Sequence, residues 1–139
     1  MTIIGTPEFV EMSLTQQALM EIQGSEYDFH LTGSRFFNTE KKDSDYDFFT
    51  QDYLSLADWL RAHDFINITQ VMPTSYADPL VIAIYQKGKV HIQVVNDAPL
   101  KQDIQECLKT SPLKNGLGNK GYARDLWRLL VSVAKSQTE

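Results

Sequence analysis

Apolar residues recur at helical spacing in four parts of the chain. The spacing predicts helices over 13–24, 55–63, 99–109 and 122–134, because side chains three or four residues apart share one helix face. Ser13 with Gln16, and Ser55 with Asp58, match the capping box that opens many helices. Gly24 is suited to end the first helix. The chain therefore carries four candidate amphipathic helices.

Between these helices the pattern favours strands. Short runs rich in β-branched and aromatic residues predict strands over 27–32, 45–49, 66–71, 79–86 and 89–95. Lys87 and Gly88 separate the last two runs and indicate a hairpin turn. Residues 111–119 are rich in Gly, Pro and polar residues and predict a loop. The order is helix, strand, turn, strand, helix, strand or hairpin, and then helices.

The chemistry concentrates between the first two predicted strands. Asp45 and Asp47 lie two residues apart, so on a strand both carboxylates point to one side. Two adjacent carboxylates repel unless a cation lies between them, and oxygen ligands of this kind suit magnesium. Gly33 permits close backbone approach to a ligand, and Ser34 offers a hydroxyl and an amide to a phosphate oxygen. Either motif alone is typical of a solvated loop, but together they suggest chemistry on a nucleotide.

The spacing of the two motifs adds a resemblance to a known group. Gly33-Ser34, a nine-residue spacer over 35–43, and then Ser44-Asp45-Tyr46-Asp47 resemble the signature of the DNA polymerase beta-like nucleotidyltransferase superfamily. The resemblance implies an α+β fold, with a small mixed β-sheet flanked by helices and further C-terminal helices. It also implies that the Gly-Ser turn and Ser44 contact a nucleoside triphosphate such as ATP, and that both aspartates bind Mg²⁺.

Active members of that superfamily usually supply a third acid from a later strand. The matching strand here reads Val-His-Ile-Gln-Val-Val, and its same-facing polar positions are His91 and Gln93. His91 has three interpretations: a general base, a ligand for a transition metal, or the mark of a site that binds without catalysing. A structural, hydrogen-bonded histidine is the alternative to all three. Asp97, just beyond the strand, is a weaker substitute for the missing acid.

Basic residues offer further candidates. Arg35 directly follows the Gly-Ser turn and is the best candidate for a phosphate contact. Lys120, Arg124 and Arg128 form a stripe on the last predicted helix, either as a solvated face or facing phosphates. Residues 116–121 match G-x-G-x-x-G, but no strand precedes them, so a dinucleotide fingerprint is rejected.

Composition limits the class of protein. The 139 residues predict one domain, with a core over 1–110 and a loop plus C-terminal helix over 111–139 packed on it. No apolar run reaches the roughly 20 residues that span a membrane, and no secretory signal is evident. The single Cys107 favours a reducing cytoplasm.

Charge bears on the partners. The net charge of −5 disfavours a long nucleic acid. Residues 1–64 hold twelve acidic and four basic residues, whereas residues 65–139 hold six acidic and nine basic. An acidic half for metal and a basic half for phosphates suit a bound nucleotide.

Two hypotheses follow. The first is a magnesium-dependent nucleotidyltransferase that moves a nucleoside monophosphate from a nucleoside triphosphate to an acceptor hydroxyl. Asp45, Asp47 and His91 would then be catalytic, and Gly33, Ser34, Arg35 and Ser44 would bind the nucleotide. The second is a degenerate member of the fold that binds a nucleotide or a protein partner as a regulator. The sequence leaves the nucleotide and the acceptor open.

Overall fold

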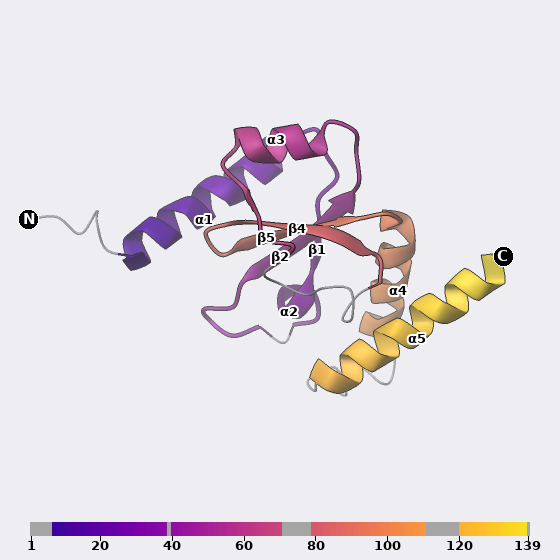
Figure 1. Ribbon diagram of the computed structural model, residues 1–139. Coiled ribbons are helices and arrows are strands. Elements are labelled where there is room, and N and C mark those ends of the chain that lie inside the picture. The colour runs from indigo at the N-terminus through magenta and orange to yellow at the C-terminus, as the bar shows by residue number, and fades with distance from the viewer. Residues whose placement is uncertain (1–6, 39, 71–78, 111–119, 139) are drawn as a thin grey trace, which may run out of the picture.

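A computed structural model describes residues 7–38, 40–70, 79–110 and 120–138, with side chains over 8–38, 40–70, 79–109 and 127–136. The fold is α+β: a five-stranded mixed sheet is flanked by helices, as predicted (Figure 1). In chain order the elements are α1 (Pro7–Gly24), β1 (His30–Thr32), α2 (Gly33–Phe36), β2 (Tyr46–Gln51), α3 (Leu56–Ala62), β3 (Ile66–Asn67), β4 (Val81–Lys87), β5 (Val90–Val95), α4 (Ala98–Thr110) and α5 (Lys120–Thr138).

The strand order in the sheet is β1-β2-β5-β4-β3. β2 and β5 run parallel, and every other neighbouring pair runs antiparallel. The parallel pair brings together residues more than forty positions apart, with Asp47 directly opposite His91. This central pairing positions the candidate site.

Helices cover both faces of the sheet (Figure 1). On one face, α1 and α3 pack on the inward side chains of β5 and β4, and Ala18, Leu60 and Ile92 are fully buried there. On the other face, α4 and α5 contribute Ile104, Trp127 and Val131 to a core built around Phe49. Because Phe49 faces α4 and α5, the strand alternation turns Asp47 toward the same face.

Three close contacts attach α1 to the β4–β5 hairpin. Lys87 Nζ, in a side chain that is 1% exposed, pairs with Glu21 Oε1 at 2.5 Å. Gly88 has a φ of 60°, and a Cβ there would lie 2.6 Å from the backbone nitrogen of Thr15. Thr15 Oγ1 also accepts a hydrogen bond from Lys89 N at 2.8 Å. Only glycine fits this approach of the turn to the helix.

The first helix begins earlier than the sequence pattern predicts. The predicted start at Ser13 is wrong, because α1 begins at Pro7 and Ser13 lies inside it. Proline is tolerated in a first helical turn, where its missing N–H has no partner. The early turns leave Phe9 and Met12 exposed, so no buried stripe marks them.

Other elements differ by smaller amounts. β1 and β3 are shorter than predicted; β3 ends where Asn67 Oδ1 accepts hydrogen bonds from the amide and the hydroxyl of Thr69. The hairpin turn is Gly88-Lys89 instead of Lys87-Gly88, because Lys87 pairs with Val90. α3 is shorter than predicted by one residue at each end, and Ser55 Oγ bonds the Tyr27 hydroxyl and does not cap the helix. Among the described helices, none is long and apolar enough to cross a membrane.

Candidate active site

The Gly-Ser turn lies directly against the Asp pair. Gly33 follows β1 and has a φ of 70°, in the left-handed region that glycine adopts without strain. A Cβ on Gly33 would lie 2.6 Å from Asp47 Oδ2. Thr32, the preceding residue, pairs with Asp47 across the β1–β2 ladder. A glycine is therefore required here by both backbone conformation and space.

Asp45 and Asp47 lie at the amino end of β2. β2 begins at Tyr46, one residue later than predicted. Asp47 is therefore the second residue of the strand, and Asp45 lies just before it. The Asp45 side chain is 51% exposed and that of Asp47 is 29% exposed. The two carboxylates thus stand where the protein meets solvent, which a site for a soluble ligand requires.

His91 lies between the two carboxylates. Its Nδ1 is 3.5 Å from Asp47 Oδ1 and 3.8 Å from Asp45 Oδ2, and its side chain is 11% exposed. His91 is the residue directly opposite Asp47 on β5, and its alignment with the third acid of the superfamily stays a prediction. The position expected for a third acid therefore holds an imidazole in contact with both carboxylates.

The surroundings favour the charged imidazole. The hydrogen-bonding contact with Asp47 raises the pKa of His91 above its ordinary 6.5, and the negative charges of Asp47 and Asp45 raise it further. Burial acts in the opposite direction and is outweighed. The protonated ring is a cation held by two carboxylates.

Asp45 and Asp47 fit a magnesium ion only if water and the phosphates of a bound nucleotide complete its coordination shell. Among the described residues, no three His, Cys, Asp or Glu side chains are arranged to hold a metal. Asp45 and Asp47 nevertheless converge on one point, since both approach the same imidazole nitrogen. Magnesium is commonly held by one or two carboxylates, with water and substrate phosphates completing its shell. The pair fits such a shared site.

The other predicted nucleotide contacts lie in α2 and in the loop before β2. Ser34 is half-buried in the first turn of α2. Ser44 Oγ accepts a hydrogen bond from Lys41 N at 2.7 Å and so shapes the loop before β2. Arg35 donates to the main-chain oxygens of Ser44 and Asp45. The structure therefore brings Gly33, Arg35 and Ser44 to the Asp pair, with Arg35 bonded to protein atoms.

Two residues on α4 contact the elements that carry the site, β1 and α2, and were missed in the sequence. Gln105 is 1% exposed; its Oε1 accepts from Thr32 Oγ1 at 2.8 Å and its Nε2 donates to Leu31 O at 3.0 Å. Lys109 Nζ lies 4.5 Å from the centre of the Phe36 ring, beside α2. Gln105 and Lys109 lie four residues apart, which places them on one face of α4. The sequence does not show which other elements that face contacts.

Other sequence candidates lie elsewhere. Asp97 Oδ1 accepts a hydrogen bond from Leu100 N and caps α4, beyond the opposite end of β5 from His91. Gln93 shares a face with His91, and its buried Oε1 has no hydrogen-bond partner within the described residues. The motif at 116–121 lies largely outside the described residues, as do the side chains at 120 and 124. Asp97 is thus not placed to replace the third acid.

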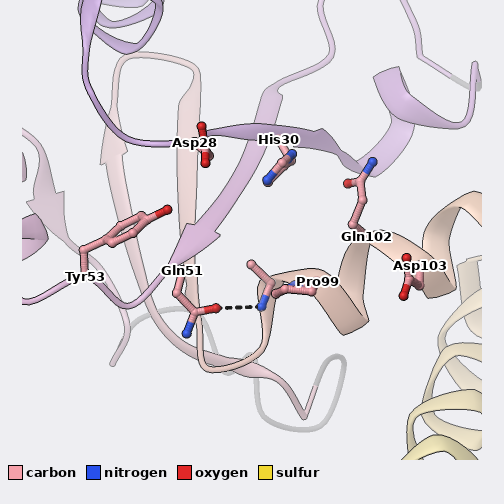
Figure 2. A pocket seen from close by; sticks show the side chains of 8 residues that line it. Asp28, His30, Gln51, Tyr53, Pro99, Gln102 and Asp103 are labelled. Carbon is pink, nitrogen blue, oxygen red and sulfur yellow. Dashed lines mark hydrogen bonds between the residues drawn. The ribbon is translucent and has the colours of Figure 1, made fainter.

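An open pocket of about 420 Å³ lies at the far end of β2 from the Asp pair. Figure 2 shows Asp28, His30 and Tyr53 around it, with Gln102 on α4 completing the lining. Gln51 Oε1 accepts a hydrogen bond from Ala98 N at 2.9 Å and fixes the start of α4 (Figure 2). Asp45 and Asp47 do not line this pocket, so it is separate from the candidate site.

Comparison with known proteins adds no relative. No protein family model, no curated protein and no solved structure gives a significant match to this chain. Function must therefore be inferred from the site.

Proposed function

We propose that this protein is a magnesium-dependent nucleotidyltransferase related to the DNA polymerase beta-like superfamily. One observation carries the proposal: Gly33 packs against the Asp47 carboxylate with no room for a Cβ. The two halves of the sequence motif, separated by the loop before β2, therefore belong to one site. Neither the Gly-Ser turn nor the Asp pair would indicate a nucleotide site if it were considered alone.

Each residue then has a role. Asp45 and Asp47 would hold the magnesium ion together with nucleotide phosphates, and the ion would neutralise charge on the phosphates. Gly33 and Ser34 would lie along the triphosphate. The acceptor hydroxyl oxygen would bond to the α-phosphorus as the bond to the bridging oxygen breaks and pyrophosphate leaves. Positioning and charge neutralisation would supply most of the rate.

His91 would manage the proton in this scheme. A neutral imidazole can accept the proton that the acceptor hydroxyl loses, and its Nδ1 already lies beside both carboxylates. The same carboxylates favour the protonated ring, so the base would be available only after a cation offsets their charge. Activity should therefore rise with pH across the His91 titration.

Calorimetric titration tests the proposal. Each of the four nucleoside triphosphates is titrated with Mg²⁺ into wild type and into the Asp45→Asn/Asp47→Asn variant. The matched control, Asp43→Asn/Asp52→Asn, removes two exposed charges, one from each side of β2. Magnesium-dependent binding to wild type and the control, lost only in the first variant, is the expected result. A well-folded wild type that binds no triphosphate would overturn the proposal.

A second candidate function is a non-catalytic regulator built on the same fold. The replacement of the expected acid by His91 favours it, because the protonated ring itself supplies a cation to the Asp pair. Exposed apolar side chains on α1, among them Met12 and Met20, suit a protein partner. Binding of a triphosphate without turnover of any acceptor class would favour this candidate over the enzyme.

A further inference from the structure

Three consecutive main-chain oxygens before β2 accept hydrogen bonds from cationic side chains. Lys89 Nζ donates to Asp43 O at 2.8 Å. Arg35 Nη2 donates to Ser44 O at 2.7 Å, and Arg35 Nε donates to Asp45 O at 3.2 Å. Bonds from charged donors are stronger than neutral ones. The segment of residues 43–45, which carries Asp45, is thus held by the side chains of Arg35 and Lys89.

Both cations are themselves anchored. The Arg35 guanidinium lies 3.8 Å from the centre of the Tyr46 ring, a stacking contact that fixes its plane. Lys89 belongs to the β4–β5 turn, where its amide donates to Thr15 Oγ1 and its carbonyl accepts from Tyr46 N at 2.9 Å. The two donors therefore reach the segment from α2 and from the hairpin.

We propose that Arg35 and Lys89 are positioning residues that hold Asp45 beside Asp47. Asp45 precedes the β2 ladder and is half exposed, so strand pairing does not fix it. Arg35 bonds the carbonyl oxygens of the two peptides that flank Asp45, and Lys89 bonds the carbonyl oxygen of the peptide before them. This inference rests on the proposed function insofar as Asp45 binds the metal. It assigns Arg35 to the loop and not to the triphosphate.

Binding of Mn²⁺ without nucleotide separates these roles. Mn²⁺ is titrated by electron paramagnetic resonance into wild type, Arg35→Met, Lys89→Met and the control Arg61→Met, whose guanidinium meets an exposed acid on α3. Losing support around a metal ligand typically weakens metal binding about 10- to 100-fold. We expect that loss in the first two variants, a smaller one in Arg35→Lys, and none in the control. Unchanged Mn²⁺ binding in Arg35→Met, with weakened nucleotide binding, would overturn the assignment.

Amide hydrogen exchange decides the case where wild type binds no Mn²⁺. That result would count against the proposed function alone. The Ser44 amide, in the held segment, donates to Lys41 O, and the Tyr46 amide, directly after it, donates to Lys89 O. Exchange at both should quicken at least about tenfold in Arg35→Met and Lys89→Met, while β4–β5 ladder amides keep wild-type rates. Unchanged exchange at Ser44 and Tyr46 would refute the positioning role.

Discussion

At the scale of single residues, the charge on His91 is set by Asp47 on the neighbouring strand and by Asp45 just before that strand. Asp47 raises its pKa most, and Asp45 adds to this through its charge. Titration of the His91 ring by NMR should give a pKa above 6.5. Asp47→Asn should lower that pKa more than Asp45→Asn does. A wild-type pKa at or below 6.5 would contradict the contacts described here.

The same shift makes stability depend on pH. A pKa raised by folding means that protonated His91 stabilises the native state. This contribution is fully present below pH 6.5 and is lost as pH rises through the folded pKa. Urea unfolding should therefore show wild type losing more stability than His91→Gln as pH rises through that range. Equal losses in both proteins would show that other groups govern the dependence.

Gly33 allows a second residue-level prediction. Gly33→Ala places a Cβ in the left-handed region and 2.6 Å from Asp47 Oδ2. The backbone strain alone costs about 1–2 kcal/mol, and the Asp47 carboxylate must also move. Gly33→Ala should thus lose stability and metal affinity together, as measured by urea unfolding and Mn²⁺ titration.

Gly24→Ala is its matched control. Gly24 ends α1 without a positive φ, and a Cβ there would meet nothing within 4 Å. Stability should stay the same or rise by up to about 1 kcal/mol. If both variants behaved alike, the close approach of Gly33 to Asp47 would not constrain the site.

Residue types in the sequence predicted part of this site. The spacing of Gly33 and the Asp pair was informative because only glycine fits against Asp47, and because two adjacent carboxylates repel unless a cation lies between them. Arg35 was different: its hydrogen bonds go to main-chain oxygens nine and ten residues later. Every residue has such an oxygen, so no residue pattern identifies the acceptor. Its contacts could be found only in the structure.

At the scale of elements, the periodicity of apolar residues predicted the presence of helices more accurately than it predicted their first and last residues. α4 differs from its predicted range by one residue at each end, because Ile104 and Leu108 are buried on one face. α1 extends six residues before its predicted start, where its apolar side chains are exposed. Burial produces the sequence pattern, so helical turns that bury nothing leave no such mark.

The attachment of α1 to the sheet supplies the element-scale prediction. Glu21→Ala leaves the ammonium of Lys87 buried without its carboxylate, although His63 O still accepts one bond at 2.8 Å. Breaking a buried ion pair on one side costs about 3–5 kcal/mol, and the partial exposure of Glu21 places this case near the lower value. Urea unfolding measures the loss.

The exposed pair on α3 is the control. Asp58 and Arg61 side chains are 81% and 66% exposed, so Asp58→Ala should change stability by less than about 1 kcal/mol. A small effect of Glu21→Ala, similar to that of Asp58→Ala, would mean that Lys87 reaches water or another acceptor when its partner is removed.

At the scale of the whole molecule, the sheet order makes the site. Neighbouring strands in sequence often pair, yet β2 pairs with β5, across α3, β3 and β4. Local patterns predicted each strand near its place, and the resemblance to a known superfamily suggested that His91 would face the Asp pair. Propensity alone does not fix strand order, because that order depends on which faces the helices cover. The parallel pairing of β2 with β5 is thus determined by tertiary packing and not by the local sequence of either strand.

The C-terminal helix tests whether the molecule unfolds as one unit. Trp127 is 8% exposed, and it shares a core with Phe49 of β2, an interior strand of the sheet. Trp127→Ala should cost about 3–5 kcal/mol, whereas Leu129→Ala, at a position 59% exposed on the same helix, should cost less than about 0.5 kcal/mol.

Trp59 serves as the reporter in the Trp127→Ala protein, because it packs on the opposite face of the sheet. If α5 and the sheet form one cooperative unit, Trp59 fluorescence and circular dichroism will give coincident urea transitions. Both midpoints will then fall relative to a Leu129→Ala protein. A Trp59 transition that kept its midpoint would show that α5 is an appendage, and that the sheet holds the Asp pair and His91 together without it.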